Sequence, residues 1–151
     1  MSDPNNRLNG HVFETTFPLD SGVFLINGVL SYQPSNRRLT PYVGLGMGAA
    51  GLSIRGADSL QVVPAEPGVN HFNSKPDSTD WTFAAQAKVG LRLRLTERAY
   101  LFAEYRFLYI GSTTHVFGST VYPTHFETSP WTVDFDGMCN HLGVGGIGFS
   151  F

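Results

Sequence analysis

Apolar and polar side chains alternate with a period of two along most of this chain. The clearest stretch covers residues 81–95, where every odd position from Trp81 to Leu95 is apolar and every even position is small, polar or charged. This period predicts a β-strand, because successive side chains of a strand point to opposite faces. The stretch is much longer than the usual globular strand of about five or six residues. It is long enough to cross a bilayer at a tilt, which takes about 9–11 residues.

The same period predicts five further strands. They cover residues 8–17, 22–33, 41–54, 100–111 and 138–151. Two tight turns are expected at residues 35–38 and 96–99, and two long polar loops at residues 55–80 and 112–137. Counted along the chain, the short turns fall at one end of the strands and the long loops at the other. Outer-membrane barrels have this asymmetry, with short periplasmic turns and long extracellular loops.

Charged side chains lie on the face opposite the apolar one. They are Lys88, Arg92 and Arg94 on one expected strand and Glu104 and Arg106 on the next. In a barrel that spans a bilayer, the apolar face contacts lipid and these charges face the lumen. A soluble barrel has the reverse arrangement. Charges in a narrow lumen are costly unless they are paired, so we expect a compensated cluster around Glu104.

The register of the hairpin decides which cation meets Glu104. If residue numbers paired across the turn sum to about 196, Arg92 lies directly opposite Glu104. A slip of two makes the pair diagonal neighbours, which long side chains still bridge. The outward set, expected to form an apolar belt, comprises Trp81, Phe83, Val89, Leu91, Leu93, Leu101, Tyr105 and Phe107.

Composition narrows the class of protein. Charged residues make up 15% of the chain and the net charge is −2, which gives no basic field for nucleic acid. No run of eighteen apolar residues occurs, which excludes a transmembrane helix. Cys139 is the single cysteine, so no intrachain disulfide can form. Residues 1–7 lack the apolar core of a signal peptide.

Four segments resemble one known family. Residues 41–48 (PYVGLGMG), 90–97 (GLRLRLTE), 102–108 (FAEYRFL) and 141–151 (HLGVGGIGFSF) are similar to strands of small bacterial outer-membrane β-barrels of the opacity-protein and OmpA-like, porin-type family. The resemblance implies an antiparallel up-and-down transmembrane barrel of eight strands, six of them visible here, formed as one domain over residues 1–151. It also implies that the first strands and the signal peptide are missing. Phe149 and Phe151 would belong to the C-terminal signal read by the barrel-assembly machinery.

Motifs for chemistry are absent from the sequence. The five histidines show no HExxH or HxH spacing, and the glycine runs lack the Lys-Ser/Thr of a phosphate-binding loop. We therefore expect no catalytic, cofactor-binding or metal-binding residues. Two weaker alternatives are a loop site made of His115, His125 and Glu127, and a lipid-modifying arrangement of Ser112 or Ser119 with His115.

The leading hypothesis for function is a surface structural or interaction protein of the bacterial outer membrane, adhesin-like or antigen-like, and not an enzyme. Its expected partners are outer-membrane lipid, the barrel-assembly machinery and, at an open barrel edge, further chains that complete the barrel. Nucleic acid is not among the expected partners. The alternatives are a lipid-modifying enzyme, a narrow pore, and a soluble barrel that binds an apolar ligand.

Overall fold

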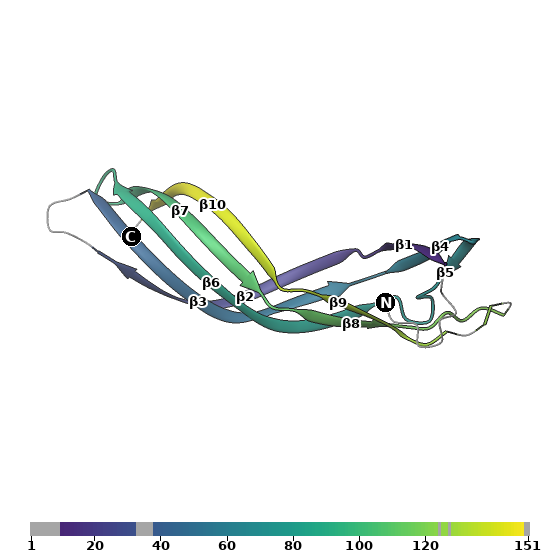
Figure 1. The fold of residues 1–151 in the computed structure, drawn as a ribbon. Coiled ribbons are helices and arrows are strands. Elements are labelled where there is room, and N and C mark those ends of the chain that lie inside the picture. Colours follow the sequence, from purple (N-terminus) through teal and green to yellow (C-terminus); the bar gives the residue numbers. More distant parts are fainter. Residues whose placement is uncertain (1–9, 33–37, 124, 127, 150–151) are drawn as a thin grey trace. The chain divides into compact units, whose positions relative to one another are not determined.

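A computed structural model describes residues 10–32, 38–123, 125, 126 and 128–149, and these residues form antiparallel β-strands with no helix among them (Figure 1). Across this part of the chain no helix is long and apolar enough to cross a membrane. The strands are β1 (Val12–Thr16), β2 (Leu19–Ser31), β3 (Leu39–Ile54), β4 (Asp58–Val63), β5 (Ala65–Asn70), β6 (Ser78–Arg94), β7 (Ala99–Ile110), β8 (Thr113–Phe117), β9 (Trp131–Phe135) and β10 (Met138–Phe149). The predicted all-β antiparallel class is confirmed.

The long strands pair in one sheet of five, in the order β10-β7-β6-β3-β2. They match the five long strands predicted from the alternation, with shifted ends. β6 has 17 residues and β3 has 16, well beyond the usual globular length of about five or six. β2 and β10 are the outer strands of this sheet, so the described strands do not close into a barrel.

The turn between β6 and β7 fixes the register of the predicted hairpin. The Leu95 N–H donates to the Ala99 carbonyl (2.9 Å), and the Thr96 hydroxyl accepts from the Ala99 N–H (3.0 Å). The chain therefore reverses about Glu97. Paired residue numbers sum to 194, as in Gly90 opposite Glu104. The hairpin therefore has the alternative register, shifted by two from the sum of 196.

The chain divides into two compact units, each made of three segments. Unit 1 comprises Met1–Gly22, Gly51–Trp81 and Ser112–Asp136; unit 2 comprises Val23–Ala50, Thr82–Gly111 and Gly137–Phe151. Three of the boundaries fall inside β2, β3 and β6, and the other two fall between strands. The prediction of one domain over residues 1–151 stays a prediction.

Unit 1 corrects two predictions. The segments 55–80 and 112–137 are not structureless loops, because they carry β4, β5, β8 and β9. The predicted strand 8–17 becomes β1, which pairs with β4 and not with the sheet of long strands. The sequence pattern did not predict β4, β5, β8 and β9, because each has only five or six residues and only two or three side chains reveal its buried face.

An aromatic core holds unit 1 together. Phe117 on β8 is fully buried, and its ring stacks on Phe72 at 4.9 Å and on Phe17 at 5.4 Å between centroids. Phe72 also meets the edge of Trp131 at 6.0 Å. Each large ring buries roughly 150–250 Å² of surface. A few aromatic residues thus supply the apolar contacts that order segments otherwise rich in polar residues and proline.

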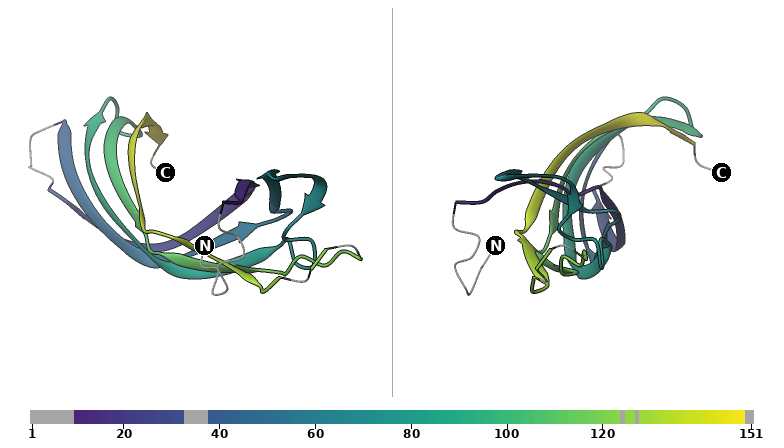
Figure 2. Two further views of the ribbon diagram at one scale, coloured as in Figure 1. Left: turned by 45° about the vertical axis from the view of Figure 1, so that its right-hand side comes forward. Right: turned by 90° about the vertical axis from the view of Figure 1, so that its right-hand side faces the viewer.

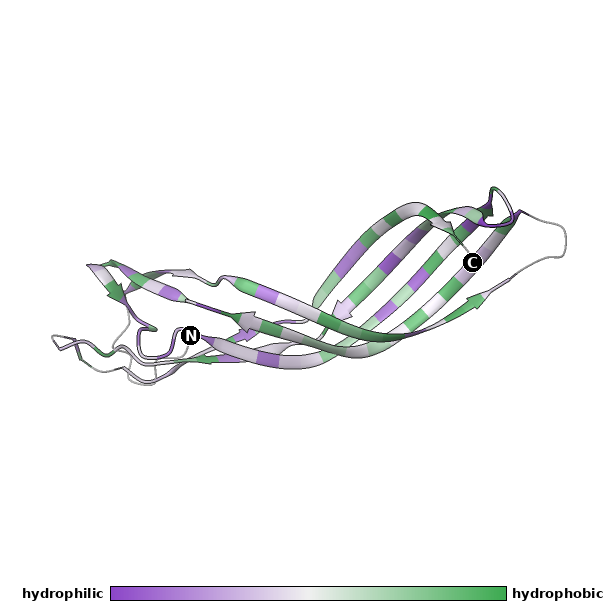
Figure 3. Ribbon diagram, turned by 180° about the vertical axis from the view of Figure 1, so that it is seen from behind, coloured by the Kyte–Doolittle hydropathy of each residue, from purple (hydrophilic) through white to green (hydrophobic). Residues whose placement is uncertain are grey.

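Unit 2 shows the opposite distribution of apolar side chains. Its strands lie side by side in a curved sheet (Figure 2), and apolar and polar residues alternate along them (Figure 3). The predicted exposure of the apolar set is confirmed for Phe83, Val89, Leu91, Leu93, Leu101 and Tyr105, and for Trp81, the last residue of the Gly51–Trp81 segment of unit 1; these side chains are 38–61% exposed. Phe107 is half-buried, because its ring packs 5.3 Å from that of His141 on β10.

The exposed apolar face continues onto the neighbouring strands. Ile26 on β2 is 85% exposed and Leu45 on β3 is 73% exposed. On β10, Ile147 and Phe149 lie on the same face. His141 also lies there, and its Nδ1 forms a 2.6 Å hydrogen bond with the Tyr105 hydroxyl. The face therefore covers all five strands of the sheet.

Truncating the central core ring should destabilise unit 1 selectively. We expect Phe117→Ala to cost about 3–5 kcal/mol, the usual range for a buried phenylalanine that leaves a cavity. Hydrogen exchange should show faster exchange in β8 and β9, with protection in β6 and β7 between residues 84 and 110 unchanged. Val116→Ala, at a neighbouring exposed position, is the control and should have little effect. Equal exchange in the two variants would contradict this account of the core.

A carboxylate links β6 to β8. The Thr114 N–H (2.9 Å) and the Trp81 N–H (2.8 Å) donate to Asp80 and hold the pKa of its carboxyl below the usual value. Because the folded pKa is the lower one, ionised Asp80 stabilises the fold above about pH 3.9, the unfolded value. That contribution is lost as the pH falls through the folded pKa.

Replacing Asp80 should therefore have a pH-dependent effect on stability. Asp80→Asn should lower the free energy of unfolding at pH 7, and its difference from the parent should shrink below about pH 3.9. Urea unfolding followed over a pH series measures this. Asp20→Asn, at an exposed position, serves as control. A difference between parent and Asp80→Asn that is constant over pH would contradict the prediction.

Candidate functional site

The polar face of the five-stranded sheet gathers most of the predicted charge cluster. Glu104 on β7 is 8% exposed, and its carboxylate accepts a hydrogen bond from Arg106 Nε. Lys88 lies directly opposite Arg106 on β6. The predicted pairing of Glu104 with an arginine is therefore confirmed, with Arg106 as the partner. Arg92 lies opposite Phe102 and diagonal to Glu104, as the slipped register requires.

Glycines make room for the large polar side chains on this face. A Cβ at Gly44 would come within 2.7 Å of the Lys88 side chain, and a Cβ at Gly90 would clash with the Tyr42 ring. Tyr42 is 4% exposed, and the Arg92 guanidinium lies 4.7 Å from its ring centre. On β3 and β6, a bulky polar side chain of one strand thus packs over a glycine of the other.

Further polar contacts extend the same face toward β2. Gln86 Nε2 donates to Asn27 Oδ1 (2.9 Å), and the Asn27 side chain lies over Gly46. At the turn end, Arg94 is exposed and lines a polar pocket of about 250 Å³ together with Arg92, Thr40 and Tyr100. Arg94 is therefore separate from the Glu104 ion pair. The buried polar groups of the cluster contact one another, which is typical of structural packing.

The C-terminal signal is described only in part. Phe149 is 65% exposed on the outer face of β10, as the alternation predicted. Phe151 lies outside the described residues. The role of both phenylalanines in barrel assembly stays a prediction.

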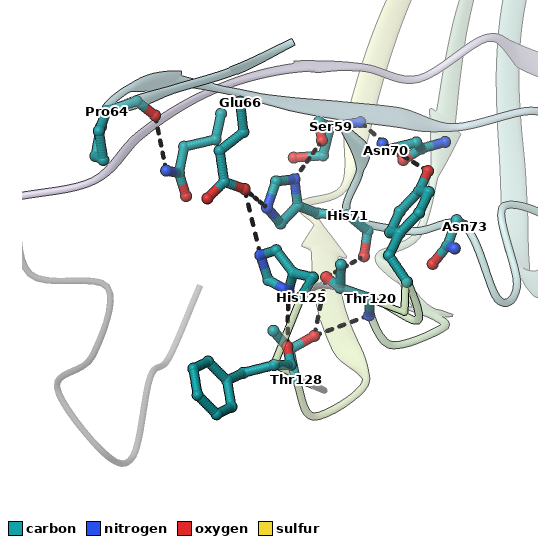
Figure 4. A network of polar contacts seen from close by, with 12 residues as sticks. Ser59, Pro64, Glu66, Asn70, His71, Asn73, Thr120, His125 and Thr128 are labelled. Atoms are coloured by element: carbon teal, nitrogen blue, oxygen red, sulfur yellow. Dashed lines mark hydrogen bonds and ion pairs between the residues drawn. The ribbon is translucent and has the colours of Figure 1, made fainter. Parts of the chain in front are cut away.

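A second cluster lies in unit 1 and brings together residues that are distant in sequence (Figure 4). Glu66 is on β5, His71 follows the end of β5, and His125 lies between β8 and β9. Glu66 Oε2 lies 3.3 Å from His125 Nε2 and 3.6 Å from His71 Nε2. Ligand atoms from the three side chains all lie within 4.8 Å of one another.

Backbone carbonyl groups orient both imidazoles. His71 Nδ1 lies 2.9 Å from the Ser59 carbonyl oxygen, and His125 Nδ1 lies 2.7 Å from that of Phe126. A carbonyl oxygen only accepts hydrogen bonds, so each Nδ1 carries a proton. In the neutral rings, each Nε2 then carries a lone pair, and both lone pairs are directed toward the Glu66 carboxylate.

Hydrogen bonds fix the segment that carries His71. The Thr120 hydroxyl donates to the His71 carbonyl (3.1 Å), and Asn73 exchanges two hydrogen bonds with the backbone of Val121. The Phe13 ring packs edge-on against the His71 imidazole at 5.0 Å. His71 is 1% exposed. Contacts within the protein thus hold the His71 imidazole in place.

The sequence did not predict this cluster. The sequence predicted no metal site, and the alternative loop set consisted of His115, His125 and Glu127. His125 belongs to the observed cluster and His115 does not, while Glu127 lies outside the described residues. His115 is buried against Phe135, with its ring centre 5.4 Å away. Among the described residues no hydrogen bond joins His115 to Ser112 or Ser119. The separation of 54 positions between His71 and His125 leaves no local spacing that a motif could capture.

Comparison with protein-family models, with curated proteins and with solved structures finds no significant match to this chain. The features of this chain that bear on function are the two faces of the long sheet and the two polar clusters. The first cluster consists of the Glu104–Arg106 ion pair and packed side chains. The second has lone pairs that converge on one point.

Removing the buried carboxylate should destabilise the long sheet. Glu104→Ala leaves Arg106 and Lys88 close together without a counter-charge, which should lower the free energy of unfolding by a few kcal/mol. Thermal and urea unfolding of the parent and the variant in the same detergent measure this. Glu97→Ala, in the exposed turn, is the control. Matching unfolding curves for the two variants would show that the ion pair does not stabilise the sheet.

Proposed function

We propose that this chain is a β-barrel protein of the bacterial outer membrane that acts as a surface structural or interaction protein. The observation that carries the proposal is the exposed apolar face of the five-stranded sheet, opposite a face that carries the charged side chains, the buried Glu104 among them, and several glycines. Lipid is the proposed occupant of the apolar face. The polar surface of unit 1 is the proposed region of contact with other molecules.

The contrast between the two faces supports lipid as the occupant. Ile26 is 85% exposed and Leu45 is 73% exposed, whereas Glu104 is 8% exposed. A soluble protein distributes these residue types the other way round. Contiguous apolar patches on soluble monomers seldom exceed a few hundred Å². An apolar face that covers five strands, each long enough to cross a bilayer, suits a hydrocarbon environment.

The edges of the sheet place a requirement on the proposal. Each unpaired backbone group in hydrocarbon costs several kcal/mol, so β2 and β10 must find partners in a bilayer. They can pair with each other or through further strands. The resemblance of four segments to the opacity-protein and OmpA-like family supports closure of this kind, since its members are closed barrels.

The polar face favours an anchor over a pore. Tyr42, Lys88 and Arg92 extend across neighbouring strands and pack on glycines or on one another. In small barrels of about eight strands, such side chains fill the interior. A catalytic role for His115 with Ser112 or Ser119 has no support from the contacts of these residues. These features favour a structural barrel that presents unit 1 to other molecules.

A charge placed on the apolar face tests the proposal. Leu45→Arg should destabilise the protein in lipid vesicles by about 2–4 kcal/mol, the cost of arginine near the bilayer midplane. Val116→Arg, at an exposed position in unit 1, is the matched control and should cost little. Urea titration of folding into vesicles measures both values.

A water-exposed Leu45 gives a different result. On a solvated surface the substitution to arginine is close to neutral, so the variant would fold in buffer as well as the parent does. Equal stability of Leu45→Arg and Val116→Arg, together with folding in the absence of lipid or detergent, would overturn the proposal.

A further inference from the structure

We propose that Glu66, His71 and His125 form a binding site for Zn²⁺, with a water molecule as the fourth ligand. Two imidazole nitrogens and one carboxylate oxygen are a preferred zinc donor set, and three protein ligands leave one position of a tetrahedron open. The site lies wholly within unit 1. It is independent of the polar face of the long sheet and of the proposed membrane environment.

The spacing of the donor atoms suits a tetrahedral ion. With metal–ligand distances of about 2.0–2.1 Å, ligand atoms at the corners of a tetrahedron lie about 3.3–3.4 Å apart. Glu66 Oε2 lies 3.3 Å from His125 Nε2 and 3.6 Å from His71 Nε2. Both distances match the tetrahedral edge to within a few tenths of an ångström. They exceed the usual length of a direct hydrogen bond, about 2.7–3.2 Å.

Two of the three donor atoms also lack hydrogen-bond partners. Glu66 Oε2 and His71 Nε2 are both enclosed, and neither has a hydrogen-bond partner among the described residues. Buried polar atoms are normally paired, and an unpaired atom calls for a ligand or a proton. Two lone pairs that face a carboxylate need a positive charge between them. A single added proton would bridge Glu66 to only one imidazole, whereas one cation at the centre binds all three atoms.

The outer contacts match those of a zinc site. Zinc-binding histidines usually donate the other ring N–H to a carbonyl or carboxylate, which fixes the tautomer and the orientation of the ring. His71 and His125 donate to the Ser59 and Phe126 carbonyls in this way. A bound ion would join β5, the turn that follows it and the segment between β8 and β9. Zinc would therefore stabilise unit 1 as a crosslink between three segments.

The test uses the full chain without a polyhistidine tag, stripped with a chelator and refolded in detergent. Isothermal titration with Zn²⁺ should show one equivalent bound, and Co²⁺ should give the intense visible bands of tetrahedral coordination. Glu66→Gln and His125→Gln should each weaken Zn²⁺ binding more than about tenfold, since loss of even an outer-shell partner costs about 10–100-fold. His71 is left unchanged, because its burial makes misfolding of a variant a competing explanation.

Two controls accompany these variants. His11→Gln removes an imidazole of unit 1 that is outside the cluster and should leave Zn²⁺ binding unchanged. Mg²⁺ and Ca²⁺ should not displace Co²⁺, because these ions prefer all-oxygen sites with more ligands. Zinc affinity should also weaken as the pH falls, since the imidazoles must be neutral to bind.

The proposal is overturned by any of three results. The parent fails to bind Zn²⁺ with one-to-one stoichiometry, Glu66→Gln and His125→Gln bind as tightly as the parent, or His11→Gln loses as much affinity as they do. Circular dichroism of every variant shows that the comparison is made between folded proteins. Failure of lipid insertion would overturn the proposed function without affecting this site.

Discussion

The pleat of one antiparallel sheet is the constraint on which most of this structure depends. Because side chains alternate between its faces, every strand must divide its residues between two environments. One face carries exposed leucine, isoleucine, phenylalanine and tryptophan, while the other buries Glu104 and Tyr42. The register of β6 and β7 then determines that Gly90, not Arg92, lies opposite Glu104. That glycine leaves space for the Tyr42 ring, which also packs against the Arg92 guanidinium.

Unit 1 follows a different physical rule. Its strands have only five or six residues, or are the ends of longer ones, and a small aromatic core stabilises them. Phe72 and Phe117 stack at its centre. Side-chain hydrogen bonds, such as those of Asn73 to the Val121 backbone, add to this core. Segments that would otherwise be mobile loops are thereby ordered well enough to hold three distant side chains around one point.

The two polar clusters differ in how well their groups are satisfied. Glu104 is paired with Arg106 and has Lys88 and the Tyr42 hydroxyl near it, so it needs nothing from outside the protein. Glu66 Oε2 and His71 Nε2 face each other without a hydrogen-bond partner among the described residues. Buried polar groups that remain unpaired after folding indicate a ligand more strongly than residue identity alone. This criterion separates structural packing in unit 2 from the metal-binding potential of unit 1.

The sequence by itself determined the class of fold, the strands of the long sheet and the division of their residues between two faces. Those features follow from the local period of apolar and polar residues, which residues close together in the sequence encode. It also predicted that Glu104 would meet an arginine, because two adjacent strands and a short turn leave few registers. Only the tertiary structure decided that β1 pairs with β4, that the long polar segments fold around Phe117, and that His125 reaches Glu66 and His71. These contacts join positions far apart along the chain. They depend on packing in three dimensions, which produces no repeating pattern of residues in the sequence.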